Sequence, residues 1–430
     1  MGINSCGTTL IDNGTFKNIG AITWDTTAKT AGFTAVAGNG YFCNTTSAAF
    51  TVTLPSSPTA GDTVGISDYA NTADTNNITI GRNGSNIQGV ANDFIINIEG
   101  ASVLLTYVDA TKGWLLIDAA RASDIEEGPT YIVATGGSIT TSGDYKIHTF
   151  TGPGTFTVCS VGNPVGGGSN VDYLVVAGGG GGGNNRASGG GAGGYRESHS
   201  TPVSGCYTAS PLATPTGITV SATPYPITVG GGGGATGAGS NSIFSTVTSA
   251  GGGGGVASSN GAVGGSGSGA SCRDGNSSFT GGAGNTPPVS PPQGNSGGNA
   301  SGSPSGGYRG AGAGGGGAGA AGSPSPNSNT GGNGGNGSTS SINASSITRA
   351  GGGGGGAPSC AAPFGGPPPG TAGTGGSGGG GAGNTGCGNA TSGTANTGGG
   401  GGGSGQKMGS PNVCGGAGGS GIVIIRYKYQ

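Results

Sequence analysis

Residues 173–183 read Tyr-Leu-Val-Val-Ala-Gly-Gly-Gly-Gly-Gly-Gly, an apolar run followed at once by six glycines. The same order returns at 226–234, where Pro-Ile-Thr-Val precedes five glycines, and at 247–255, where Val-Thr-Ser-Ala precedes five more. Short apolar and β-branched runs of this kind predict strands. A disordered linker has no reason to place strands ahead of its glycine blocks. The pattern therefore favours a folded structure in which the backbone dominates.

Ordinary secondary structure does not suit the glycine blocks themselves. A strand of glycine has no side chains to pack, and a glycine helix loses conformational entropy at every position. The polyproline II conformation remains, with a rise of about 3.1 Å per residue, so that a block of six spans roughly 19 Å. Without Cβ atoms, neighbouring chains can approach on every side and bond through their backbone N–H groups. We therefore expect an array of polyglycine II helices over about residues 178–420.

Collagen and a flexible linker account less well for the glycine excess. Collagen requires glycine in a strict Gly-X-Y register, which is absent, and the whole chain holds only 23 prolines. A flexible Gly/Ser linker would not contain interleaved apolar residues. This region contains Ile243, Phe244, Val247, Phe279, Ile342 and Ile347. These residues predict anchors that hold the glycine segments to a folded base.

Strands are predicted on both sides of the glycine-rich stretch. Four candidates precede it, at 131–134, 144–150, 154–158 and 172–176. The run Gly-Ile-Val-Ile-Ile-Arg-Tyr-Lys-Tyr at 421–429 follows it and is the most strand-like in the chain. We expect this last run to close the sheet formed by 131–177. Residues 131–430 would then be one glycine-rich domain, with a β platform made of 131–177 and 421–429.

The first part of the chain has a different composition. Of the 110 glycines, 18 lie in the first 150 residues and the other 92 (110 − 18) lie beyond them. Residues 1–13 predict an N-terminal attachment arm, 14–120 an all-β fibre module resembling a β-sandwich, and 121–130 a charged linker ending in Gly-Pro. The strands expected in the module are 50–54, 63–66, 77–80, 94–98 and 102–108, with a hairpin over 107–117. The predicted fold class is all-β throughout.

Charge and composition exclude several functions. Net charge is −2 and charged residues make up 7% of the chain, so no basic surface for nucleic acid is expected. No apolar run is long enough to cross a membrane, and residues 1–6 predict no secretory signal. Eight cysteines occur without any Cys-x-x-Cys pair, so no zinc or other metal site is expected. No cofactor is expected either. Cys360, Cys387 and Cys414 are spaced by 27 residues, which could reflect either a repeating path or coincidence.

Catalysis is not expected either. Beyond residue 200 the only carboxylate is Asp274, so the glycine-rich part cannot supply the paired acids of a glycosidase. Of the two histidines, His148 alternates within a strand and is interpreted as structural, whereas His199 could lie at the rim of a binding surface. The carboxylates of the N-terminal module fall in turns, where Asp caps backbone groups. They are Asp62, Asp68, Asp74, Asp93 and Asp109.

Binding through loops fits the pattern better. A rigid scaffold tolerates variation in its loops, and proline-rich loops lose little entropy when they bind. The distinctive insertions are 207–215, 287–293, 358–370 and 406–414. The predicted contact residues within them are Tyr207, Phe364, Lys407 and Met408, together with His199. Tyr195-Arg196 and Tyr308-Arg309 both follow Gly-Gly and are interpreted as framework residues.

Several segments together resemble a known family. Residues 173–183, Gly-Gly-Gly-Ala-Gly-Gly-Tyr-Arg at 189–196, Gly-Ser-Asn-Ser-Ile-Phe at 239–244 and Gly-Ser-Gly-Ile-Val-Ile-Ile-Arg-Tyr at 419–427 resemble the glycine-rich domain of tail fibres of marine bacteriophages such as cyanophages. The N-terminal module is similar to modules found in tail fibres of the same viruses. The chain also resembles the distal adhesins of some T-even-like phages, in which polyglycine II helices display variable recognition loops. No individual receptor-contacting residue transfers from those adhesins.

The resemblance implies a non-enzymatic virion fibre or adhesin. Its N-terminus would attach to other phage tail or fibre proteins, and its glycine-rich end would bind a host surface glycan or outer-membrane protein. Analogy with fibres implies a homotrimer, although no coiled-coil heptads are present. Two alternatives remain open: a structural virion component of tail or capsid without receptor binding, and a cellular surface-filament protein.

Overall fold

The computed structural model describes residues 22–120, 129–164, 166–272, 277–301, 310–359, 370–386, 388–407 and 414–430, with backbone alone at 359 and 406–407. It also describes the backbone of three short strands near the start of the chain, which pair as an antiparallel sheet: β1 (Ile3–Ser5), β2 (Thr8–Asp12) and β3 (Thr15–Phe16). The chain forms two compact units, Met1–Glu127 and Gly128–Gln430. The division between them falls inside the charged segment 121–130.

The N-terminal unit contains two facing sheets. The five-stranded sheet has the order β12-β11-β8-β6-β4, with bounds β4 (Thr23–Lys29), β6 (Asn39–Cys43), β8 (Thr63–Asp68), β11 (Ser102–Asp109) and β12 (Gly113–Ala120). The four-stranded sheet has the order β10-β9-β7-β5, with bounds β5 (Phe33–Thr34), β7 (Phe50–Thr53), β9 (Ile78–Gly81) and β10 (Phe94–Ile96). Alternate residues of both sheets point inward and form a core that includes Val52, Leu54, Ile66, Leu105 and Trp114.

All five strands predicted for this module exist, and β11 and β12 form the predicted hairpin. The strand directions were not predicted. From β4 to β9 the chain alternates between the two sheets, so that β4, β6 and β8 pair in parallel in one sheet and β5, β7 and β9 pair in parallel in the other. Parallel neighbours need a long connection, and here each connection passes through the opposite sheet.

The second unit also begins with two sheets. The larger has the order β14-β15-β28-β17-β18-β19, with β20 beside β17, and its bounds are β14 (Ser138–Ser142), β15 (Tyr145–Phe150), β17 (Asn170–Val176), β18 (Tyr195–Ser198), β19 (Ala213–Thr214), β20 (Ile218–Thr219) and β28 (Ile422–Lys428). The smaller has the order β13-β16-β21-β22-β23, with bounds β13 (Val133–Thr135), β16 (Gly154–Ser160), β21 (Pro224–Thr228), β22 (Ser242–Phe244) and β23 (Val247–Ser249). The core beside these strands includes Phe156, Tyr173, Phe244, Ile425 and Tyr427.

The last strand lies where the sequence predicted, within the larger sheet of the platform. β28 lies between β15 and β17 and is antiparallel to both, so residues far apart in the chain close one sheet. The expectation of a single platform sheet was wrong, because β13 and β16 belong to the smaller sheet. One turn of helix, α1 (Thr201–Ser204), was also not predicted.

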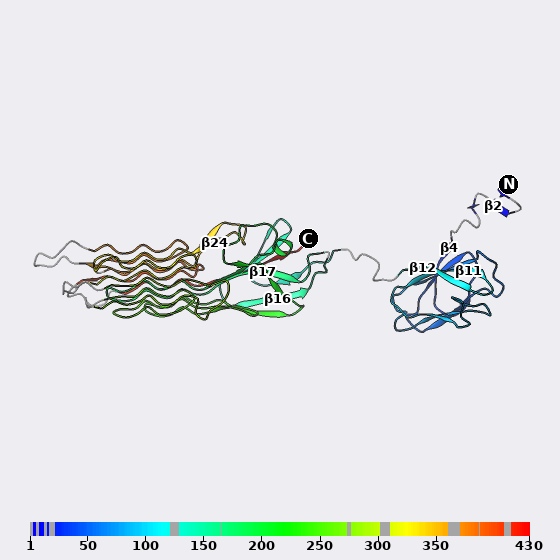
Figure 1. Ribbon diagram of the computed structural model, residues 1–430, viewed down its shortest axis with the longest axis horizontal. Coiled ribbons are helices and arrows are strands. Elements are labelled where there is room, and N and C mark those ends of the chain that lie inside the picture. The colour runs from blue at the N-terminus through cyan, green and yellow to red at the C-terminus, as the bar shows by residue number, and fades with distance from the viewer. Residues whose placement is uncertain are drawn as a thin grey trace, which may run out of the picture. The chain divides into compact units, whose positions relative to one another are not determined.

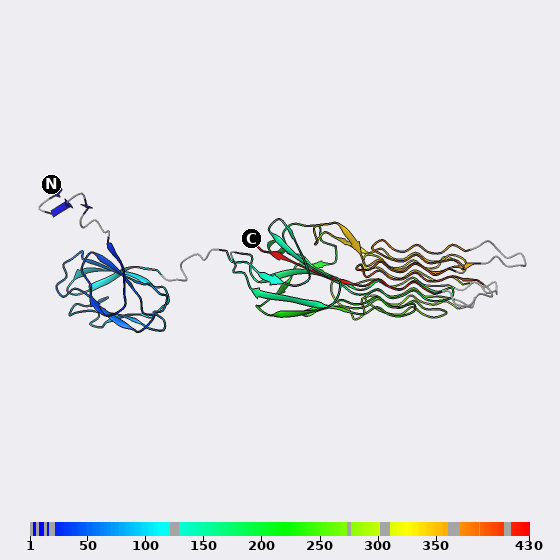
Figure 2. The same ribbon diagram turned by 180° about the vertical axis from the view of Figure 1, so that it is seen from behind.

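Beyond the sheets, most glycine segments of the described chain carry no strand assignment and run out and back side by side (Figures 1 and 2). Their backbone groups bond between segments with a period of three. In 178–183, the N–H groups of Gly178 and Gly181 donate to the carbonyls of Ser240 and Gly237, at 3.0 and 2.9 Å. The other four N–H groups of 178–183 form two more pairs, each with members three residues apart, and each pair donates to a different segment. The three acceptor segments are 237–240, 416–419 and 188–191, all antiparallel to 178–183.

The carbonyl groups of 178–183 follow the same rule with three other neighbours. Each neighbour donates two N–H groups, again three residues apart, and runs in the same direction as 178–183. These segments are 233–236, 252–255 and 401–404. Residues 178–183 are therefore surrounded by six segments, and every one of their N–H and C=O groups has a backbone partner. This satisfies the buried backbone without any strand ladder.

The glycines of this array have no room for side chains. A Cβ atom placed on Gly179, Gly180 or Gly182 would meet backbone atoms of a neighbouring segment and no flexible side chain. One short hairpin and one parallel pair complete the described secondary structure of the unit. They are formed by β24 (Ser338–Ser340), β25 (Ile347–Arg349), β26 (Pro358–Ser359) and β27 (Gln406–Lys407), with β24 pairing β25 and β26 pairing β27.

Candidate functional site

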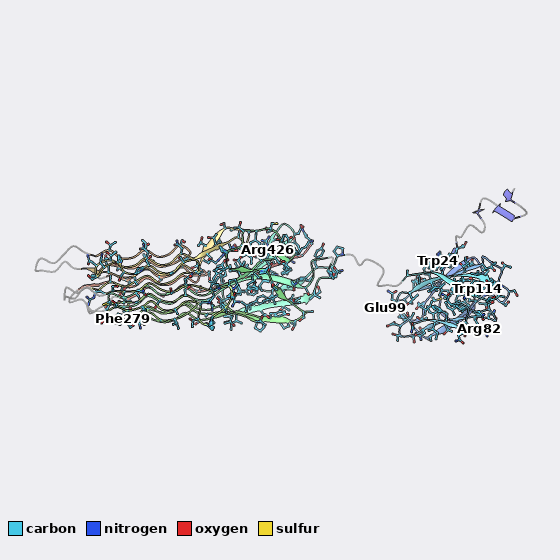
Figure 3. All side chains as sticks on the ribbon, viewed as in Figure 1. Trp24, Arg82, Glu99, Trp114, Phe279 and Arg426 are labelled. Atoms are coloured by element: carbon cyan, nitrogen blue, oxygen red, sulfur yellow. The ribbon has the colours of Figure 1, made fainter. Side chains whose placement is uncertain are left out.

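The array has one end at the sheets and another remote from them. Phe279 lies at the remote end and Arg426 of β28 at the sheet end (Figure 3). Phe279 packs there against Cys272 and Ala300, both almost fully buried, in a small cluster of its own. Single bridge pairs link neighbouring segments along this edge, including Phe279 with Ala300 and Ser271 with Gly312. Among the described residues, neighbouring segments are thus joined to one another at the remote edge.

Two of the four predicted binding loops start at this edge. Gly312 donates its N–H to the carbonyl of Gly356 at 2.9 Å, and β26 follows directly. In the parallel pair β26–β27, Pro358 lies opposite Gln406 and Ser359 opposite Lys407. The first residues of the loops 358–370 and 406–414 therefore lie side by side. The first loop is closed at its base by a bond from Gly370 N–H to the Pro358 carbonyl at 3.0 Å.

The residues predicted to make contact within these two loops are only partly described. Lys407 is placed by its backbone in β27. Phe364 and Met408 lie outside the described residues. The structure therefore brings the two loops together at their bases, and receptor contact by these three residues stays a prediction.

The other two predicted loops lie at the sheet end of the unit. In the segment 287–293, Gln293 is fully buried, and its side chain accepts the Ala250 N–H and donates to the Pro287 carbonyl, both at 2.8 Å. In the segment 207–215, Ser210 N–H bonds the carboxylate of Glu197 at 3.1 Å. Both segments are thus fixed to the platform, at the end of the array opposite the loop pair 358–370 and 406–414.

Tyr207 and His199 occur together in this second place. Their rings meet edge to face at 4.3 Å between centroids, and Tyr207 donates its hydroxyl to the Ser198 carbonyl at 3.1 Å. The Arg426 guanidinium lies 5.2 Å from the centre of the Tyr207 ring, and burial raises the pKa of the Tyr207 hydroxyl well above its ordinary value. Both side chains are half-buried, and their predicted role in receptor contact stays a prediction.

Two buried carboxylates hold this corner of the platform. Asp172 accepts hydrogen bonds from the Ser198 and Ser204 hydroxyls, both at 2.6 Å, and from Ser200 N–H at 2.7 Å. Glu197 accepts bonds from the Tyr195 hydroxyl at 2.9 Å and the Ser340 hydroxyl at 2.6 Å. Each carboxylate is almost fully buried and surrounded by donors. They stabilise the packing of α1, β18 and β24.

The remaining ionisable residues singled out in the sequence have structural partners. His148 is fully buried in β15, with Nδ1 2.7 Å from the Gly136 carbonyl and Nε2 2.9 Å from the Tyr427 hydroxyl, which confirms its structural interpretation. Burial lowers the pKa of His148. The turn role is also confirmed for the aspartates that cap backbone N–H groups from positions outside the core, which are Asp62, Asp93 and Asp109. It was wrong for Asp68, which is buried at the end of strand β8 and accepts the N–H groups of Ala73 and Gly100. Asp74 instead accepts the Thr75 hydroxyl.

Among the described residues, no three His, Cys, Asp or Glu side chains are grouped to hold a metal ion. The described cysteines carry free thiols, and they are Cys43, Cys159, Cys206, Cys272 and Cys414. Cys6, Cys360 and Cys387 lie outside the described residues, so the meaning of the 27-residue spacing stays open. Tyr195 is buried with its hydroxyl bonded, as a framework residue would be, whereas Tyr308 and Arg309 lie outside the described residues. None of the helices that the structure describes has the length and hydropathy of a membrane span.

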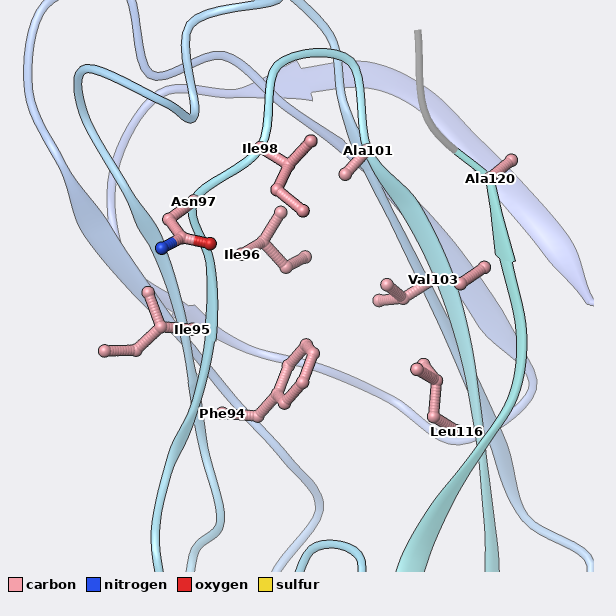
Figure 4. A pocket seen from close by; sticks show the side chains of 10 residues that line it. Phe94, Ile95, Ile96, Asn97, Ile98, Ala101, Val103, Leu116 and Ala120 are labelled. Atoms are coloured by element: carbon pink, nitrogen blue, oxygen red, sulfur yellow. The ribbon is translucent and has the colours of Figure 1, made fainter. Parts of the chain in front are cut away.

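The N-terminal unit has an apolar pocket of about 130 Å³ where its two sheets part (Figure 4). It lies between the edge strand β10 and the strands β11 and β12, and is lined mainly by Phe94, Ile96, Ile98, Val103 and Leu116. Its volume is well below the roughly 300 Å³ at which small-molecule sites usually begin.

Fold and site together define a mostly β protein whose larger unit is a glycine-rich array on a platform of two sheets. The family comparison agrees with this class. A family model described as "Glycine-rich domain" matches residues 151–428, which is more than half of the chain, and the chain belongs to that family. No curated protein matched the chain.

Proposed function

We propose that the glycine array is a packed bundle of polyglycine II helices. The period-three bonding of 178–183 to six neighbours supports this, because a helix with three residues per turn points successive backbone groups toward three different sides. The absence of space for a Cβ atom at Gly179, Gly180 and Gly182 supports it as well. Such a bundle is a stiff scaffold that needs no apolar core of its own.

We further propose that the chain is a non-enzymatic phage tail fibre or adhesin that binds a host cell-surface receptor. The observation that carries this proposal is the pairing of β26 with β27, which places the bases of loops 358–370 and 406–414 next to each other at the remote edge of the array. A receptor-binding protein needs variable loops on a rigid support, presented away from its point of attachment. The receptor would be a host glycan or an outer-membrane protein.

The other parts of the proposal rest on the resemblance to phage fibres. The protein would belong to the virion tail and would attach through its N-terminus to another tail or fibre protein. It would assemble as a homotrimer. The near absence of carboxylates beyond residue 200, together with the burial of Asp172 and Glu197, favours binding over hydrolysis.

Host adsorption is the test of receptor binding. Residues 360–369 are replaced by a Gly/Ser segment of equal length, which keeps β26 and the closing Gly370–Pro358 bond. The control variant replaces the turn 221–223 between β20 and β21, at the sheet end of the unit. Virions carrying the first variant should lose adsorption while keeping normal morphology, and virions carrying the control should adsorb normally.

Two outcomes would contradict the adhesin. Unchanged adsorption of intact virions with the 360–369 replacement would favour a structural virion component. Polymers of the chain on cells that hold no virions would favour a cellular surface filament. Immunogold labelling of virions and of uninfected cells separates these two results.

A further inference from the structure

The outer face of the five-stranded sheet in the N-terminal unit has an unusual composition. One row of paired residues crosses all five strands, and each member is in register with the next. In order along the row they are Trp24, Gly40, Gly65, Leu104 and Asp118. Their chain neighbours Tyr41, Ile66, Val103 and Leu105 are buried in the core, so this row points away from it.

The two glycines make room for the tryptophan. A Cβ atom on Gly40 would lie 2.6 Å from Cδ2 of the Trp24 ring, and one on Gly65 would overlap Ile22 and approach Cη2 of Trp24 to 3.3 Å. The indole thus lies flat over β6 and β8, at positions where both strands carry glycine. Glycine in the interior of a strand weakens the strand, and such a position often marks a close approach from outside. Here the approach is by the Trp24 ring.

Trp24 is held in this place but is not covered. Its ring stacks on Phe42 with centroids 4.9 Å apart and planes inclined by 30°, and 38% of the residue is exposed. Tyr69, 60% exposed, meets the Phe42 ring edge to face with centroids 6.4 Å apart. Figure 3 shows Trp24 at the border of its unit. Large aromatic residues exposed in this way on a rigid sheet are typical of contact surfaces.

A hollow of about 270 Å³ lies beside the ring. Ile22 and Trp24 form one wall, and Leu104, Asp118 and Ala120 form the other. The Trp24 ring reaches Gly65 on β8, and Asp118 lies on β12. Because β11 lies between β8 and β12, Gly65 and Asp118 are two strand spacings apart, about 10 Å. That distance is suited to one or two sugar rings.

We propose that this hollow is a saccharide-binding site, with Trp24 as the stacking surface and Asp118 as the polar partner. The C–H groups of a pyranose carry partial positive charge, which suits the negative face of an indole. The exposed Asp118 carboxylate accepts bonds from sugar hydroxyls. Ser102 also lines the hollow; it donates its hydroxyl to Ser67 at 2.7 Å, and its oxygen can still accept a bond from a sugar hydroxyl.

The charge of the site selects a neutral sugar. Among the described residues that line the hollow, the only ionisable side chain is acidic, so a phosphate or a sialic acid would be repelled. This site is separate from the proposed loop surface, since it belongs to the other compact unit. The inference does not depend on the adhesin proposal, and the two can fail independently.

Tryptophan emission of the full chain provides a direct test. The chain holds two tryptophans, and Trp114 is fully buried in the core, so a ligand-induced change reports on Trp24. The probes are methyl α-glucoside, methyl α-mannoside, methyl β-galactoside and N-acetylglucosamine. We expect saturable quenching by at least one of them, with a Kd in the millimolar range that is usual for a small shallow contact.

Variants locate the binding. Asp118→Asn, at an exposed position, should weaken the sugar about tenfold, and Trp24→Ala should abolish saturation-transfer NMR signals from it. Tyr69→Ala removes an exposed aromatic residue outside the hollow and should leave the Kd unchanged. Lack of quenching by all four probes, or equal affinity in wild type and Asp118→Asn, would overturn the proposal. A Trp24 emission change that depends on protein concentration without sugar would also overturn it, because a second copy would then cover the face.

Discussion

A single methyl group inside the array should be far more damaging than one at its surface. Gly180 lies in the surrounded segment 178–183 and is fully buried. Its N–H donates to Gly191 and its carbonyl accepts from Gly401, both at 2.9 Å. In the variant Gly180→Ala the new Cβ would overlap the carbonyl of Gly253 and approach the Gly252 oxygen to 2.9 Å. No rotamer relieves this contact, because both sides are backbone.

The cost follows from two effects. Overpacking a well-packed interior costs about 1–3 kcal/mol. Shifting the segment to relieve the overlap leaves at least one buried backbone group poorly bonded, which costs about 1–3 kcal/mol more. We therefore expect the free energy of unfolding of the C-terminal unit to fall by roughly 2–6 kcal/mol. That is a large part of the 5–15 kcal/mol that ordinarily stabilises a domain.

Gly231 offers a matched control in the same array. It is exposed, its φ lies outside the left-handed region, and a Cβ atom there has no heavy atom within 4 Å. Gly231→Ala should leave the free energy of unfolding unchanged or raise it by about 0.4–1 kcal/mol, because alanine restricts the unfolded chain.

Calorimetry of the full chain measures both variants. Each kcal/mol shifts Tm by about 2–4 °C in domains of 150–250 residues and by somewhat less in a larger unit such as Gly128–Gln430, so Gly180→Ala should melt several degrees below wild type. Urea titration followed by far-UV circular dichroism gives the same comparison at constant temperature. If Gly180→Ala and Gly231→Ala melted together, the close packing of backbone against backbone would be refuted.

Three further predictions concern single side chains. Because burial lowers the pKa of His148, the unfolded state binds more protons than the folded state below about pH 6.5. Tm of the C-terminal unit should therefore fall as pH drops below about 6.5, until the pKa of His148 in the folded state is passed. A His148→Gln variant whose Tm changes with pH at the same slope would contradict this. Glu197→Gln presents an amide N–H₂ to surrounding donors and should cost about 1.5–3 kcal/mol in urea denaturation, whereas a change below about 0.5 kcal/mol would show that the buried network is not needed. Burial, with Asp68 nearby, raises the pKa of the Cys43 thiol to about 12. Iodoacetamide should therefore label the exposed Cys159 and Cys206 in the native chain and leave Cys43 unmodified. Equal labelling of all three cysteines, measured by mass spectrometry, would contradict the burial of Cys43.

Local pattern was enough to predict most strands of the fold. Alternation and β-branching located β7, β11, β17 and β28, because these features depend on residues a few positions apart. Strand direction was not accessible in this way. β6 and β8 are parallel because the chain between them crosses to the other sheet and returns, and no residue within either strand records that path. The helical turn α1 was missed for a similar reason, since its partner Asp172 lies about 30 residues earlier.

The candidate site was predicted only in part. Proline and aromatic content picked out four loops, but composition does not say at which end of an out-and-back path a loop lies. The structure separates them into 358–370 and 406–414 at the remote edge and 207–215 and 287–293 at the platform. A usable signal was present, because each pass along the array reverses its direction. Counting passes outward from β17 would have assigned each loop to an end.

The same geometry accounts for the polar composition that first suggests low complexity. In this array a side chain fits only at positions that do not face a neighbouring segment. The N–H groups at the border of the array have no backbone carbonyl as acceptor. Asparagine supplies that acceptor. Asn333 and Asn336 accept from Thr374 and Ser377 at 2.9 and 3.1 Å, so both sides of the contact keep the three-residue spacing. Further asparagines do the same for single N–H groups of other segments, and they are Asn184, Asn241, Asn260 and Asn299. A neutral amide can satisfy the N–H groups at the border of the array, whereas a charged side chain there would also have to keep its own water of hydration. An array of this kind therefore favours Asn, Ser and Thr over Lys and Glu.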